Sequence, residues 1–199
     1  MSAPIVSWYS RDNSASLTNW NIGTVDAGTV SAEFGFLIWN NRYNGSTVGT
    51  TAVSTMTDCV ITVKDTAGGL TGNELVTGQW VQVKVDTKGE TTFTSIGSTD
   101  TTPPATEGNP TPETTYSPVE HAIQSDSTAF GAKCAATLDQ TGKPIDPAGF
   151  NSPIGGFIND GTKANALANF CELTLRVNVP ETAPAGSIDF LTRVRYSYV

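Results

Sequence analysis

Residues 20–41 read WNIGTVDAGTVSAEFGFLIWNN, and this stretch decides the fold class. In its second half, apolar side chains recur at every second position from Phe34 to Ile38, which is the period of a β-strand. The pattern predicts one long strand over residues 32–39 and a short strand near residues 20–22. The two asparagines that follow tolerate positive φ and favour turns, so they predict where the long strand stops.

The same alternation marks further strands along the chain. They are expected at about residues 3–9, 58–64, 79–85, 170–179 and 187–198, with a loop that crosses between sheets at 46–55. The last two strands are separated by a seven-residue turn, 180–186, and are predicted to pair as a hairpin. The number and spacing of these strands predict an all-β, immunoglobulin-like β-sandwich that forms a single domain over residues 1–199.

The middle of the chain, about residues 91–165, has no hydrophobic periodicity of its own. Within it, residues 98–118 are rich in Pro and Thr, a composition that favours an extended or polyproline-like segment. Residues 163–169 contain the only indication of a helical turn. We therefore interpret 91–165 as an irregular insertion that precedes the C-terminal hairpin, and not as a second domain.

Charge and composition exclude several classes of partner. The net charge is −8, the pI is near 4.5, and the basic residues are scattered except for Arg193 and Arg195, which alternation assigns to one outward strand face. Phosphate backbones and anionic membranes attract clustered Lys and Arg, so neither a nucleic acid nor a membrane is expected as partner. No apolar run approaches the roughly 20 residues of a membrane span. The N-terminus lacks the features of a signal peptide, so we expect synthesis and folding in a cytoplasm.

Three cysteines, an odd number, argue against a disulfide framework. Cys59 and Cys171 are in phase with the apolar residues of their strands and are expected to be buried as small hydrophobic side chains. A bridge between these two remains open if their strands face each other.

The sequence offers no recognisable catalytic, cofactor-binding or metal-binding set. His121 is the only histidine, it follows Glu120 near a proline-rich loop, and it is expected to be a solvated surface residue. Ser117 lies nearby but not in a nucleophile elbow, and no Asp-rich calcium loop has the required spacing. We therefore predict a protein that is not an enzyme, with no cofactor and no metal.

The four tryptophans allow an alternative reading. Trp8, Trp20, Trp39 and Trp80 could line the face of a carbohydrate-binding or host-adhesion module, which would need two exposed tryptophans aligned on one face. The competing reading is that they fill the core or cap its ends. Trp39 is out of phase with the apolar face of its strand and is assigned to packing or to an interface.

Two sets of segments resemble known families. The run IGTVDAGT at residues 22–29, followed by FGFLIWNN, resembles the opening of immunoglobulin-like domains of the abnormal-spindle/hydin type. The segments SAPIVSWYS, WNIGTVDAGTVSAEFGFLIWNNR and VPETAPAGSIDFLTRVRYSY resemble virion structural proteins of tailed phages of Gram-positive bacteria. This second resemblance covers about the first 90 and the last 30 residues.

The resemblance implies a non-enzymatic virion structural protein, with no catalytic residues to carry over. Such small sandwich proteins decorate a capsid or join a tail, so the implied function is that of a decoration or cement protein on the outer surface of the shell. The implied partners are the major capsid protein, other virion proteins and copies of the chain itself. A tail or neck position is the alternative within this class. Residues 2–10 and 98–118 are the segments expected to form interfaces.

Overall fold

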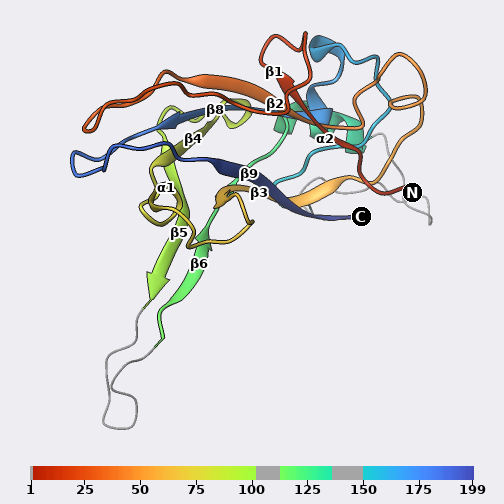
Figure 1. The fold of residues 1–199 in the computed structure, drawn as a ribbon. Helices are drawn as coiled ribbons and strands as arrows, with labels where there is room; N and C mark the ends of the chain where they lie inside the picture. The colour runs from red at the N-terminus through yellow and green to blue at the C-terminus, as the bar shows by residue number, and fades with distance from the viewer. Residues whose placement is uncertain (1, 102–112, 136–149) are drawn as a thin grey trace.

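The computed structural model describes residues 2–101, 113–135 and 150–199, and its fold is all-β, with 38% strand and 12% helix (Figure 1). The first half of the chain contains β1 (Val6–Ser10), β2 (Phe34–Asn40), β3 (Met56–Asp65), α1 (Glu74–Thr77), β4 (Val81–Val85), the 3-10 turn η1 (Asp86–Lys88) and β5 (Thr94–Thr101). The second half contains β6 (Thr115–Val119), β7 (His121–Ala122), α2 (Ser127–Ala135), the 3-10 turns η3 (Lys163–Asn165) and η4 (Leu167–Asn169), β8 (Phe170–Val177) and β9 (Phe190–Tyr198).

The strands form two antiparallel sheets. The larger sheet has six strands in the order β1-β2-β8-β4-β5-β6, and the smaller has three in the order β7-β3-β9. β1 is an edge strand, as expected from Pro4, which removes a backbone donor from the predicted segment 3–9. The 41–55 connection leads from β2 in the larger sheet to β3 in the smaller one, which confirms the predicted crossing loop.

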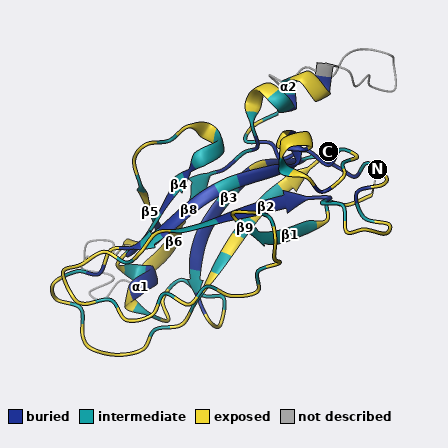
Figure 2. Ribbon diagram, turned by 90° about the horizontal axis from the view of Figure 1, so that it is seen from above, coloured by how far each residue is buried: buried dark blue, intermediate teal, exposed yellow. Residues whose placement is uncertain are grey.

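The main core lies between the two sheets. Apolar side chains from β2, β4 and β8 pack against those of β3, and Phe190, Val194 and Tyr196 of β9 cover part of the same cluster. Figure 2 shows the consequence: β3 and β8 are buried along most of their length, whereas β9 alternates between half-buried and exposed residues. Cys59 and Cys171 are buried in this core, and all three cysteines are free, as predicted.

The predicted C-terminal hairpin is wrong. β8 pairs with β2 on one side and β4 on the other, while β9 pairs with β3 in the smaller sheet. The two residues that follow β8 are also paired, because Asn178 N–H donates to Trp80 O and Val179 N–H donates to Thr29 O. β8 therefore has no free edge for β9, and the seven-residue connection crosses between the sheets. Alternation could not reveal this, because a hairpin and a crossing connection bury the same alternate side chains.

Residues 91–165 are not an irregular insertion. They contain β5, β6, β7 and α2, and β5 extends the larger sheet by pairing with β4. The helical turn expected at 163–169 is present as two 3-10 turns, η3 and η4. The central part of the Pro/Thr-rich segment, 102–112, lies outside the described residues, as does 136–149. The flanks of the Pro/Thr-rich segment form a β-hairpin and not a polyproline helix.

The short strand expected near residues 20–22 is also absent. Residues 18–25 make no backbone–backbone hydrogen bond in the described part of the chain, although Trp20, Ile22 and Val25 pack against the core. β2, in contrast, ends at Asn40 as predicted, and Asn41 adopts the expected positive φ of 63°.

Four asparagines close the body where β2 ends, and we call this the asparagine end: Asn40, Asn41, Asn159 and Asn169. Asn41 Nδ2 donates to Thr51 O at 2.8 Å and Gly156 O at 3.1 Å, and Asn41 Oδ1 accepts from Gly49 N–H. The side chain of Asn40 likewise forms hydrogen bonds with the backbone of three segments, at Ile5, Ser54 and Ile154. Buried backbone groups of irregular loops thus obtain partners that no ladder supplies.

Candidate functional site

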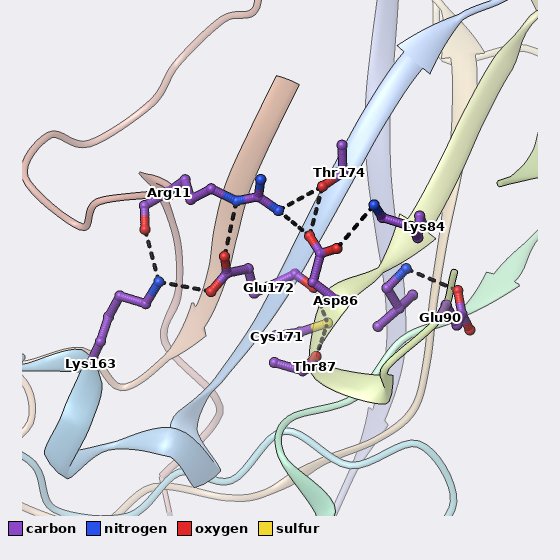
Figure 3. Close-up of polar contacts among 10 residues, drawn as sticks. Arg11, Lys84, Asp86, Thr87, Glu90, Lys163, Cys171, Glu172 and Thr174 are labelled. Atoms are coloured by element: carbon purple, nitrogen blue, oxygen red, sulfur yellow. Dashed lines mark hydrogen bonds and ion pairs between the residues drawn. The ribbon is translucent and has the colours of Figure 1, made fainter. Parts of the chain in front are cut away.

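A network of charged side chains covers the outer face of the larger sheet (Figure 3). Arg11, just after β1, donates through Nε to Glu172 Oε1 at 2.9 Å and also pairs with Asp86. Thr174 Oγ1 accepts from Arg11 at 2.7 Å and donates to Asp86 Oδ2 at 2.6 Å. Lys163 completes the network by donating to Glu172 Oε2 at 2.7 Å.

The contacts of this network hold segments of the chain together. Arg11 lies across Gly35 of β2, where a Cβ would come within 2.5 Å of its Nε, so only glycine permits this approach. Both carboxylates of the network are paired with cations, which leaves neither as a general base. The contacts tie the loop after β1 and the turn η3 to the middle of the sheet.

His121 is not the solvated residue that the sequence predicted. It lies in β7 with its side chain 17% exposed, and its Nε2 is 2.9 Å from Glu90 Oε2. Lys88 Nζ also contacts Glu90, at 2.8 Å. Burial would raise the pKa of Glu90, but the hydrogen bonds from Lys88, the Val85 N–H and His121 outweigh it and lower the pKa below the usual value.

A histidine beside a carboxylate would support nucleophilic catalysis only with a hydroxyl or thiol in reach. Among the described residues, no hydroxyl or thiol hydrogen-bonds to His121. Burial raises the pKa of Cys171 to about 12 and raises the pKa of Cys59 still further from its usual value, so both thiols stay protonated. The contacts of His121 hold β7 against the turn after β4.

The tryptophans lie buried or half-buried. Trp39 is fully buried against Phe170, with ring centroids 4.7 Å apart, which confirms its assignment to packing. Trp80 is 9% exposed, and Trp8 and Trp20 are half-buried. The exposed, aligned pair that a sugar-binding face requires is therefore not formed by these four residues.

An open groove, which we call the aromatic groove, lies at the end of the body opposite the asparagine end. It has a volume of about 960 Å³. Its floor carries Trp8, Phe34 and Phe36 of the larger sheet, and its two walls are residues 17–25 and 183–192. The rings form a continuous row, with centroid distances of 5.4 Å (Trp8–Phe36), 5.9 Å (Phe36–Phe34) and 5.2 Å (Phe34–Trp20).

A second candidate surface is the outer part of the β5–β6 hairpin, residues 99–101 and 115–118, which we call the arm. Figure 1 shows the arm projecting from the body, and each of its residues is exposed. β5 leaves β4 after Ile96, and from Gly97 onward it pairs only with β6. Gly97 has φ of 149°, and a Cβ there would lie 2.3 Å from Val76 O, so the change of direction requires glycine.

The base of the arm is held firmly. The buried Ser98 donates through Oγ to Leu70 O at 2.7 Å, and its carbonyl accepts from Gln79 Nε2 at 3.1 Å. Thr62 Oγ1 contacts both strands of the hairpin, at Gly97 O and Val119 O. The arm therefore leaves the body in a fixed direction, with each of its own residues exposed.

Sequence reasoning identified the aromatic residues but neither surface. The one available signal for the arm was the β-branched and aromatic content of STDT (98–101) and TYSPV (115–119), which the flanking prolines outweighed. The described residues contain no group of three or more His, Cys, Asp or Glu placed to bind a metal ion, and no described helix is long and apolar enough to cross a membrane. No protein-family model, curated protein or solved structure matches this chain.

Proposed function

We propose that this protein is a non-enzymatic structural subunit of a tailed-phage virion, and that it acts as a decoration protein on the outer surface of the capsid. The observation that carries the proposal is the arm: a two-stranded ribbon with both faces exposed, on a base fixed by Ser98 and Thr62. An isolated two-stranded ribbon is marginally stable in water, so a surface of this kind gains most from a partner that covers it.

The resemblance of the N-terminal and C-terminal segments to virion proteins gives the class of partner. Within this proposal, the two sheets are the halves of an immunoglobulin-like sandwich, a reading supported by the connections that cross between them after β2 and β8. Segment 2–10 contributes differently from the arm, because β1 is paired with β2 on one edge and bonds to residues 15–17 on the other. Its contribution to an interface would come from exposed side chains such as Ile5, which is 40% exposed.

The proposal is tested on purified particles with and without this gene, by mass spectrometry and cryo-electron microscopy. We expect the protein on the outer surface of the shell. Absence from the particle would overturn the virion assignment, and presence in the tail or neck alone would overturn the capsid position.

A shortened variant tests the arm itself. Ser98 and Pro118 are register partners, so an Asn-Gly turn that joins them removes the arm while keeping its base. We expect an unchanged circular dichroism spectrum and at least a tenfold loss of affinity for particles. Tyr116→Ser tests one exposed aromatic of the arm, and Ile158→Ser, which removes an exposed side chain elsewhere, is the matched control. If the shortened variant bound particles as tightly as the wild type does, the arm would not be the surface that attaches the protein to the particle.

A further inference from the structure

We propose that the aromatic groove accepts a β-strand from a different polypeptide, an extended segment in which apolar side chains alternate and basic residues are present. This inference concerns another surface than the arm and goes beyond the proposed function. It rests on the free edge of β9, the row of rings beside it and the charge of the lining.

Both walls of the groove present backbone groups without a protein partner. β9 pairs with β3 along one edge only, and its other edge is free among the described residues. In the opposite wall, residues 18–25 make no backbone–backbone hydrogen bond, as noted above. Of the two walls, β9 supplies the extended backbone that an added strand requires, because main-chain hydrogen bonds supply much of the affinity in strand addition. In the opposite wall, Gly23 has φ of 75° and its N–H donates to Asn21 Oδ1.

The floor fits the side chains of such a strand. Alternate residues of a strand lie about 6.6 Å apart on one face. The rings of Trp8, Phe34 and Trp20 are half-buried, and the buried Phe36 lies between Trp8 and Phe34 in a row with centroid spacings of 5.2 to 5.9 Å. Inward side chains of the added strand would meet the three half-buried rings. Contacts between aromatic and β-branched side chains are among the favourable pairings in sheets.

The charge of the groove selects for basic residues. Asp189 is the only charged residue in the lining. Beside the lining in sequence, Glu74 adjoins Leu75 and Arg193 adjoins Thr192, so the charge of the lining itself comes from Asp189. An incoming strand with Lys or Arg between its apolar positions would therefore be favoured over an acidic one.

Neither end of the described chain lies at the groove. Ser2 is held by Val53 and Ser54, and the N–H of Val199 donates to Thr55 O, so both ends of the described chain lie at the asparagine end. Figure 1 shows the N and C labels at the opposite end of the molecule from the turns of the two walls. The arm of a second copy is disfavoured, because it carries Asp100 and no cation.

The test is binding of synthetic peptides to the full-length protein, measured by calorimetry. The probe alternates valine with lysine and threonine over about nine residues, which is the length of β9. One control replaces each lysine by glutamate, and a second keeps the composition but makes the valines contiguous. We expect both controls to bind at least tenfold more weakly. Equal affinity for either control would overturn the proposal.

Two variants locate the site. The N–H of Val199 points to β3, so by alternation the N–H of Thr192 points to the free edge. Thr192→Pro should abolish binding while the ladder with β3 stays intact, and Asp189→Lys should reverse the preference between the lysine and glutamate peptides. Hydrogen exchange should show new protection at residues 18–25 and in β9 when the lysine peptide binds.

The remaining outcomes also decide the question. Undiminished binding to a folded Thr192→Pro variant would place the peptide elsewhere and overturn the proposal. Self-association of the wild type that Thr192→Pro abolishes would make a second copy the occupant and overturn the choice of a different polypeptide. Because the arm-shortened variant keeps the groove, it should bind the peptide as the wild type does, which separates this inference from the proposed function.

Discussion

The two ends of the body differ in how backbone groups outside the sheets obtain hydrogen-bond partners. At the asparagine end, irregular segments lose their contact with water, and side-chain amides of Asn40, Asn41 and Asn169 bond to the backbone that the sheets do not pair. At the groove end, residues 18–25 and β9 approach without pairing and leave a cavity of about 960 Å³. The first end is satisfied internally, whereas the second presents backbone and rings to a partner.

The difference has consequences for rigidity. Backbone groups with buried partners open only when the surrounding structure opens, whereas exposed, unpaired backbone is available for exchange and for new contacts. We therefore expect hydrogen exchange in the unliganded protein to be slow at Asn41 and Gly49 and fast over residues 18–25. Equal protection at both ends would contradict the comparison.

The largest expected effect comes from a pair of tryptophans. Trp39→Ala should lower the free energy of unfolding by about 4 kcal/mol, because a fully buried ring leaves a closed cavity beside Phe170. Trp20→Ala should cost about 1 to 2 kcal/mol, because a half-buried ring at the rim of an open groove leaves no closed cavity.

Urea unfolding followed by far-ultraviolet circular dichroism measures both tryptophan variants. Trp39→Phe is the conservative control, since it keeps most of the packing and removes an indole N–H that has no hydrogen-bond partner. Similar losses for Trp20→Ala and Trp39→Ala would show that the groove end is packed as tightly as the other.

A smaller effect is expected at Asn41. Asn41→Ala removes the hydrogen bonds of the side chain to Thr51, Gly156 and Gly49. It also places alanine, which tolerates positive φ less well than asparagine does, at φ of 63°. We expect a loss of about 3 kcal/mol in the free energy of unfolding. Asn41→Gly removes the same hydrogen bonds but tolerates the backbone conformation, so it should be less damaging by up to about 1 kcal/mol. A loss below about 1 kcal/mol for both variants would mean that water replaces the amide.

The sequence predicted the parts of this fold in which periodicity and burial coincide. β2, β3, β4, β8 and β9 alternate because one face of each is turned to the core, so their existence could be predicted. β5 and β6 could not, because both faces of the arm are exposed and Thr99, Asp100 and Thr101 give no apolar period. The sheet in which a strand lies is set by long-range pairing, which is why β8 and β9 were wrongly joined.

The candidate sites were harder to predict for the same reason. The network of Arg11 with Asp86 and Glu172 joins residues from three distant parts of the chain. The sequence shows that Trp20 is apolar. It does not show that the backbone around Trp20 is unpaired, because this depends on the long-range topology that places β8 and β9 in different sheets. Local sequence therefore identified the aromatic residues that line the groove but not the groove itself.

The smallest expected effect concerns acid. Glu90 has a lowered pKa because the hydrogen bonds from Lys88, Val85 and His121 outweigh the effect of burial. Since the pKa in the folded state lies below that in the unfolded chain, the stabilisation is complete above the unfolded value, about 4.3, and is lost as the pH falls through the folded value. The free energy of unfolding of the wild type should therefore decrease below about pH 4.3 in part through this group.

Glu90→Gln isolates this contribution, because the amide cannot titrate. We expect the variant to be less stable than the wild type at pH 7, with a difference that narrows at pH 3, in urea unfolding at both values. Glu74→Gln is the matched control for the change from carboxylate to amide, since Glu74 takes part in no ion pair of the described residues and should lower the stability at pH 7 less than Glu90→Gln does. A difference between wild type and Glu90→Gln that stays constant from pH 7 to pH 3 would show that Glu90 acts on β7 by packing alone. The contacts of this residue lie in the closed part of the body, so the acid effect should leave peptide binding at the aromatic groove unchanged wherever the protein remains folded.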